Sequence, residues 1–115
     1  MAAAQNTFRR GILPIILLSL LKSGDMYGYQ LVQETIRRSG GRIITQEGSL
    51  YPVLYKLLEL GYISDYKVKV GKRMVRVYYR LEPTGRTYLD ELIEDYRSIV
   101  DGVSMILEEN INGSN

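Results

Sequence analysis

The spacing of the apolar residues changes at Gly61 from the period of a helix to the period of a strand. Before Gly61, apolar residues recur at i, i+3, i+4, i+7 and i+8, namely Leu50, Val53, Leu54, Leu57 and Leu58. This pattern is typical of a helix with one face on a core. After Gly61, apolar residues alternate with mainly basic ones over residues 66–70 and 75–81. The sequence therefore predicts a helix followed by two strands.

The two strands are expected to form a hairpin with a basic tip. Gly71-Lys72-Arg73 separates them, and a short loop that contains glycine is typical of a hairpin turn. Each strand has an apolar side and a basic side, so we expect the positive charge to gather on one side of the hairpin.

Three helices are expected before the hairpin, over residues 11–22, 26–38 and 46–60. Pro14 is expected in the opening turn of the first helix, where its missing N–H removes little. Asp25 is a candidate cap for the second helix. The third helix should begin at residues 46–49, and Ser49 is a candidate cap that would place Pro52 in its first turn.

A long amphipathic helix is expected from Pro83 to about Asn110. Its apolar residues fall at the a and d positions of three heptads, namely Leu89, Leu92, Tyr96, Ile99, Val103 and Ile106. Such a helix would be about 40 Å long, whereas a head of some 80 residues has a radius of roughly 12 Å. The exposed remainder of the stripe predicts a homodimer through this helix. The alternative is that the helix folds back across its own head.

The order of these elements predicts a mainly α (α+β) protein, a winged helix-turn-helix with a C-terminal dimerisation helix. We expect a winged helix-turn-helix domain at 1–85, the dimerisation helix at 86–111 and a disordered tail at 112–115. The first seven residues also look frayed. In this fold the third helix enters the DNA major groove and the hairpin reaches along the duplex as a wing.

The composition excludes most kinds of catalysis. The chain has no Cys and no His, so it lacks the usual zinc ligands, thiol nucleophiles and the commonest proton-transfer group near neutral pH. We therefore expect no enzyme activity, no metal site and no cofactor. The longest apolar run, residues 12–21, is too short to cross a bilayer, and no signal peptide is evident. A cytoplasmic, nucleoid-associated protein without membrane contact is expected.

The charges divide the chain into a basic body and an acidic end. Residues 1–86 hold 14 Lys and Arg against 6 Asp and Glu, and residues 87–115 hold 1 against 7. A basic body favours a polyanion partner.

The polar face of the third helix favours DNA as that polyanion. It carries Ser49, Tyr51, Pro52, Tyr55 and Lys56. The tyrosines offer hydroxyls on rigid rings, and Lys56 offers a cation for phosphate or guanine. The alternative is a winged-helix module that binds protein through this tyrosine-rich face, since interfaces are also rich in tyrosine.

Three segments resemble the PadR family of bacterial transcriptional regulators. These are DMYGYQLVQE, EGSLYPVLYKLLELGYIS and GKRMVRVYYRLEPTG, and the resemblance covers about residues 9–107. It implies a homodimer that binds a palindromic operator in double-stranded DNA as a repressor. It also implies control of detoxification or efflux genes in response to phenolic acids or hydrophobic drugs.

The resemblance also assigns residues to the DNA. The major-groove helix falls on residues 46–60, which adds Gln46, and the basic wing residues fall on Lys72, Arg73 and Arg76. Tyr27 and Tyr29 match the family's YGY, and Tyr27 is taken as a DNA contact, although both tyrosines are equally consistent with plain packing.

A small aromatic or hydrophobic effector is the last expectation. A tryptophan often lines the family's effector cavity in the dimer helix, but this chain has none. Tyr96 stands near that place, with Ile93 and Val100 beside it. The alternative is that Tyr96 belongs only to the dimer core.

Overall fold

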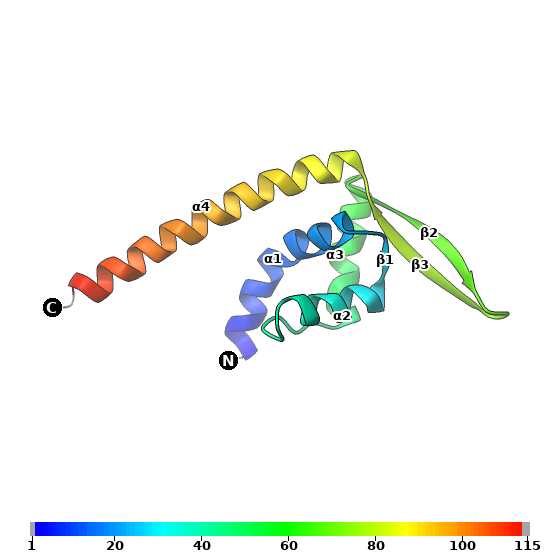
Figure 1. The fold of residues 1–115 in the computed structure, drawn as a ribbon, viewed down its shortest axis with the longest axis horizontal. Coiled ribbons are helices and arrows are strands. Elements are labelled where there is room, and N and C mark those ends of the chain that lie inside the picture. The colour runs from blue at the N-terminus through cyan, green and yellow to red at the C-terminus, as the bar shows by residue number, and fades with distance from the viewer. Residues whose placement is uncertain (1, 114–115) are drawn as a thin grey trace.

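The computed structural model describes residues 2–113, with side chains from residue 11 to residue 110 (Figure 1). The elements follow the chain as α1 (Ala2–Lys22), β1 (Met26–Tyr27), α2 (Gly28–Arg38), α3 (Glu47–Glu59), β2 (Ile63–Val70), β3 (Met74–Leu81) and α4 (Pro83–Gly113). Three helices, a hairpin and a long helix confirm the predicted winged-helix architecture.

The first helix is longer than predicted. It begins at Ala2 rather than near Gly11, so Pro14 lies in its interior and not in its opening turn. Three alanines at residues 2–4 favour helix, which explains why residues 2–7 are helical rather than frayed; Met1 lies outside the described residues. Proline removes one helical hydrogen bond and commonly bends the axis, and α1 changes direction part-way along its length in Figure 1.

A short third strand, β1, was not predicted. The sheet has the order β1-β3-β2 and is antiparallel, with Met26 opposite Tyr79. The predicted capping role of Asp25 is wrong, because α2 is preceded by Tyr27 and has no side-chain cap. Asp25 instead accepts a hydrogen bond from the Tyr66 hydroxyl at 2.7 Å and pairs with Arg80 at 3.1 Å. It ties β1 to the hairpin.

The register of the hairpin corrects the prediction of one basic side. Lys67 lies opposite Val77, and Val68 lies opposite Arg76. Directly opposed residues share a face of the sheet. The lysines of β2 are therefore on one face and the arginines of β3 on the other, so both faces of the wing carry positive charge.

The third helix begins where predicted, but its cap is different. Gln46, in an extended conformation, precedes the first turn, and the Ser49 N–H donates to its carbonyl at 3.0 Å. The capping role of Ser49 is therefore wrong, and Pro52 lies beyond the first turn. Its place on the exposed side of α3 lets water reach the backbone that its ring leaves unpaired.

The core lies where α1, α2, α3 and the sheet meet. Its fully buried side chains are Leu17, Leu18, Leu31, Leu50, Leu54 and Leu89. The predicted inner stripe of α3 is confirmed, because Leu57 is buried as well and Val53 and Leu58 pack against the core. Leu89 is a correction: it is completely buried in its own chain and has no surface left for a second one.

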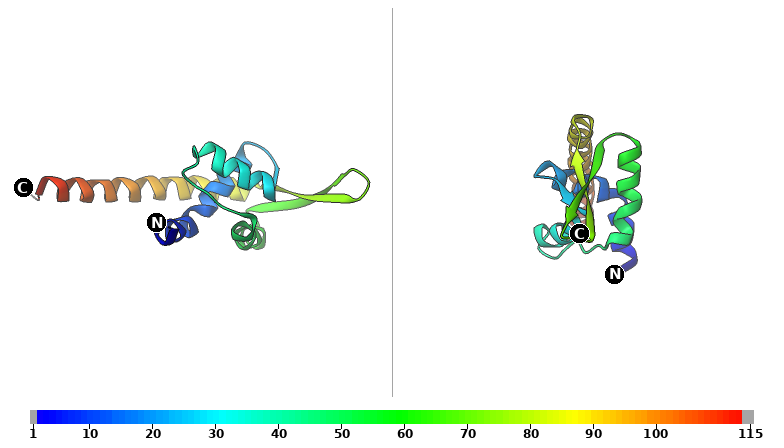
Figure 2. Two further views of the ribbon diagram at one scale, coloured as in Figure 1. Left: turned by 90° about the horizontal axis from the view of Figure 1, so that it is seen from below. Right: turned by 90° about the vertical axis from the view of Figure 1, so that its right-hand side faces the viewer.

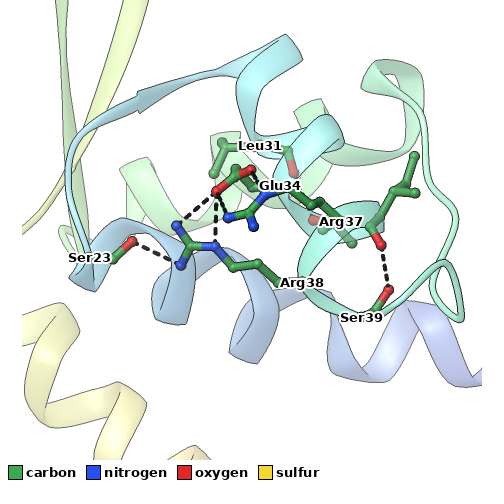
Figure 3. Close-up of polar contacts among 8 residues, drawn as sticks. Ser23, Leu31, Glu34, Arg37, Arg38 and Ser39 are labelled. Atoms are coloured by element: carbon green, nitrogen blue, oxygen red, sulfur yellow. Dashed lines mark hydrogen bonds and ion pairs between the residues drawn. The ribbon is translucent and has the colours of Figure 1, made fainter.

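A network of charged side chains lies along α2 and makes one hydrogen bond to the end of α1 (Figure 3). The Glu34 carboxylate accepts hydrogen bonds from Arg37 at 2.7 Å and from Arg38 at 3.0 Å. Arg38 also donates to the Ser23 hydroxyl at the end of α1, at 3.1 Å. The hydrogen bond from Arg37, supported by Arg38, lowers the pKa of Glu34 to about 2.

The start of α4 is clamped to the end of α3. The rings of Tyr62 and Tyr88 stack at 4.2 Å, and the Thr84 hydroxyl donates to the Gly61 carbonyl at 2.8 Å. Gly85 lies against the Tyr62 backbone with no room for a side chain. This contact, which we call the α3–α4 joint (residues 61–62 and 84–88), fixes the direction in which α4 leaves the head.

The molecule is elongated, with extents of 67 × 30 × 21 Å. The wing tip and the C-terminal end of α4 lie at opposite ends of the molecule (Figure 1). In the left view of Figure 2, α4 runs along the horizontal direction and α3 is seen nearly end-on. The acidic end of the chain is thus far from the basic wing.

Residues 112–113 belong to α4 rather than to a tail, and residues 114–115 lie outside the described residues. No helix within residues 2–113 is long and apolar enough to cross a membrane.

Candidate nucleic-acid interface

The outer face of α3 presents four of the predicted contacts to solvent. Gln46, Pro52, Tyr55 and Lys56 are exposed, and Tyr55 shows 61% of its surface. Ser49 is half-buried. Tyr55, Pro52 and Lys56 therefore form a face of α3 that is open to a partner.

Tyr51 does not point outward with the others. It is half-buried and packs against the core, with its ring stacked on Tyr55 at 6.0 Å. Its hydroxyl donates to the Glu47 carboxylate at 2.8 Å. A Cβ on Gly28 would come within 2.9 Å of that hydroxyl, so the glycine at the start of α2 makes room for this pair.

Glu47 is the residue of this surface that sequence reasoning missed. The available signal was the i, i+4 spacing of Glu47 and Tyr51, which places two side chains together on a helix. The role of Gly28 emerges only once α2 and α3 are packed.

The Tyr51–Glu47 hydrogen bond predicts a loss of stability at high pH. The bond to Glu47, aided by burial, raises the pKa of Tyr51 from 10.0 to about 12. The folded state therefore holds this proton more tightly than the unfolded state, and its stabilising effect is lost as the pH rises from 10 to 12. We expect Tyr51→Phe to lower the free energy of unfolding by about 1 kcal/mol at pH 9.

Urea unfolding of the two proteins at pH 9 and at pH 12 checks this. The difference between wild type and Tyr51→Phe should shrink at the higher pH. A difference that stays constant across this range would contradict the assignment.

The wing brings Tyr27 and Arg76 together and holds them away from its tip. The Arg76 guanidinium lies 4.4 Å from the centre of the Tyr27 ring, which meets the edge of Tyr78 at 5.4 Å. Lys72 and Arg73 lie in the exposed turn. The predicted wing residues thus divide into an exposed tip and an anchored arginine near α2.

A cleft of about 690 Å³ separates α3 from β3. Its lining includes Tyr27, Tyr29, Glu47, Tyr51, Tyr55 and Arg76. Five residues that the sequence singles out thus line the same cleft as Glu47, which it did not. A hydroxyl-rich cleft with an arginine on one wall offers hydrogen bonds and charge to an elongated polar ligand.

The second half of α4 carries the remaining predicted residues. Tyr96, Ile99, Val100, Val103 and Ile106 are between 40% and 65% exposed. Leu92 and Ile93, in contrast, pack against the core of their own chain. From Tyr96 onward, the apolar stripe of α4 is therefore left exposed by its own chain, as expected.

An apolar groove of about 630 Å³ runs between α1 and α4. Tyr96 and Val100 line it together with Ile12, Ile15, Leu92 and Ile99. Ile93 is not part of this lining, because it packs against the core, and its effector contact stays a prediction.

Comparison with known proteins agrees with the fold. The family described as "Transcriptional regulator PadR-like family" matches residues 17–91. A PadR family transcriptional regulator from Eggerthella lenta is 30% identical with a TM-score of 0.80, over 93% of this chain and 91% of that one. A Lysinibacillus sphaericus protein named "Uncharacterized protein X" is 31% identical over 86% of this chain and 91% of that protein.

A more distant structure has the same fold with DNA bound. Bacillus subtilis PadR in complex with operator DNA is 24% identical, with a TM-score of 0.67, over 71% of this chain and 46% of that one. The family match spans more than half of the sequence, in the segment that contains α2, α3 and the wing. The chain therefore belongs to the PadR-like family of transcriptional regulators.

Proposed function

We propose that the chain is a dimeric, sequence-specific DNA-binding regulator that acts as a repressor at the cytoplasmic nucleoid. The observation that carries this proposal is the exposed face of α3 with Pro52, Tyr55 and Lys56, set beside a hairpin whose tip carries Lys72 and Arg73. A helix of this kind fits the major groove, and a basic hairpin fits the neighbouring backbone.

The two-sided charge of the wing supports backbone contact. Lys67 and Lys69 lie on one face and Arg76 on the other, where Arg80 is already paired with Asp25. A hairpin that is basic on both faces can be flanked by phosphates on either side, as in a groove. A hairpin that lies flat on a duplex would need charge on one face only.

The exposed stripe of α4 supports the homodimer. From Tyr96 to Ile106 five apolar side chains share one side of a helix that leaves the head. Two-fold pairing through α4 would join two heads and place two α3 helices on a palindromic operator.

The groove between α1 and α4 supports a small aromatic or hydrophobic effector. Its volume of about 630 Å³ suits a drug-sized molecule, and the Tyr96 ring offers a stacking surface. A ligand wedged there would shift α4, and the α3–α4 joint would pass that shift to α3. We propose detoxification or efflux genes as the targets on this basis and on family membership.

Binding to a pool of random duplexes tests the DNA-binding function. We expect the protein to enrich a palindrome and its affinity to fall steeply with salt, because each phosphate contact releases counterions. The double variant Lys72→Ala/Arg73→Ala removes four cations from a dimer, so it should weaken binding to all duplexes alike and reduce the salt slope by about 4. A protein-binding module would enrich no sequence, and that result would contradict the proposal.

A further inference from the structure

Glu47 places a negative charge on the surface that is proposed to meet DNA. It is the first residue of α3 and lines the cleft between α3 and the wing. Among the described residues no ion pair neutralises it; the salt bridges of this part of the chain involve Glu34 and Asp25. A carboxylate at this position repels phosphate, so a surface selected only for affinity would not contain it.

The hydrogen bond from Tyr51 determines which hydrogen-bond donors and acceptors remain free at Glu47 and Tyr51. A tyrosine hydroxyl has one proton, and here it is donated to Glu47 Oε2 at 2.8 Å. Stacking on Tyr55 and the close approach to Gly28 hold the ring in place. The free electron pairs of Tyr51 and Glu47 are therefore acceptors, and the pair has no donor left.

We propose that Glu47 is a specificity-determining residue: with Tyr51 it forms an acceptor-only pair that requires the amino group of a cytosine or an adenine in the major groove. Those amino groups are the hydrogen-bond donors that the base edges present there, whereas guanine and thymine present acceptors. This inference depends on the proposed DNA binding. Glu47 would then favour a base with an amino group at one position and weaken binding to DNA of unrelated sequence, because its charge repels phosphate.

A simpler role for Glu47 is to stabilise the start of α3. A carboxylate in the first turn of a helix interacts favourably with the helix dipole. That role changes stability alone, and it leaves base preference and binding to unrelated DNA unchanged. The two roles are separated by measuring preference and background binding together.

The test compares wild type, Glu47→Gln and Glu59→Gln on the same pool of random duplexes. Glutamine keeps the size of glutamate and an oxygen that accepts from Tyr51, but it adds a donor and removes the charge. We expect Glu47→Gln to lose about tenfold of preference at one C·G or A·T position in each half-site. Its binding to unrelated DNA should become tighter.

Glu59→Gln is the matched control, because Glu59 is an exposed carboxylate at the other end of the same helix. It should keep the base preferences of wild type at every position. Circular dichroism and thermal melting of both variants show that the helices are intact.

Two failures are distinguishable. If wild type enriches no sequence, the proposed DNA-binding function fails. If wild type enriches a site and Glu47→Gln enriches it with the same preferences, the function stands and the inference on Glu47 is overturned.

Discussion

Ile99→Glu is expected to convert the proposed dimer into monomers and to abolish tight operator binding. Ile99 is 65% exposed on its own chain and lies in the middle of the apolar stripe of α4. In a two-fold dimer through this stripe each new carboxylate would be buried in the interface, where an unpaired charge costs several kcal/mol. Without the second head, affinity for a palindromic duplex should fall by about 10²- to 10⁴-fold.

Sedimentation at micromolar concentration measures the assembly, and gel shift on the selected duplex measures affinity. Ser98→Glu is the matched control, since it adds the same charge one residue away, at an exposed position outside the stripe. It should remain dimeric and bind DNA. An Ile99→Glu variant that stays dimeric would show that the exposed stripe of α4 is not the interface.

Gly85→Ala is expected to lower stability more than alanine at any other glycine of the described residues. Gly85 is buried in the first turn of α4, and a Cβ there would overlap the Tyr62 carbonyl oxygen. That oxygen is backbone and already accepts from the Glu82 N–H at 3.0 Å, so neither partner can move without opening the α3–α4 joint. We expect a loss of about 3 kcal/mol, which is about 15 °C in melting temperature for a domain of this size.

Gly48→Ala is the control for this prediction. It makes the same chemical change in a helix, but nothing lies within 4 Å of the new methyl group. Because alanine favours helix over glycine, its melting temperature should stay constant or rise slightly. Equal melting temperatures of Gly85→Ala and wild type would contradict the close packing of the joint.

The sequence predicts those parts of the fold that depend on local pattern. The stripe of Leu50, Leu54 and Leu57 identifies α3 and its inner face, because a helix of period 3.6 brings these residues together. The alternation of apolar and polar residues on both sides of Gly71 identifies the hairpin, because successive side chains of a strand point to opposite faces. The alanines before Phe8 extend α1, and their helix propensity was the signal that the prediction of a frayed end ignored.

The distribution of charge on the wing was within reach of the sequence. A three-residue loop at 71–73 pairs Val70 with Met74, and this pairs odd-numbered residues with odd-numbered ones along the ladder. Lys67 must then share a face with Val77 and not with Arg76. The prediction of one basic side treated each strand separately and did not use the loop length.

Contacts between segments that are distant in the chain could not be predicted from the sequence. A heptad pattern does not distinguish burial in the same chain from burial against a second chain, so Leu89 and Tyr96 look alike in the sequence although only Leu89 is in the core. In the same way Asp25 reads as a helix cap until the hairpin supplies Tyr66 and Arg80 as partners. Such assignments need the packed structure.

The number of chains bound to one selected duplex distinguishes a dimeric regulator from a protein that binds as a single chain. Native mass spectrometry of the complex should give two chains on one palindrome, with half-site centres about 10 to 21 base pairs apart. Inserting five base pairs between the half-sites turns them to opposite sides of the duplex, and tight binding should be lost. One chain per duplex, or tight binding that tolerates the insertion, would show that two α3 helices do not act together on one operator.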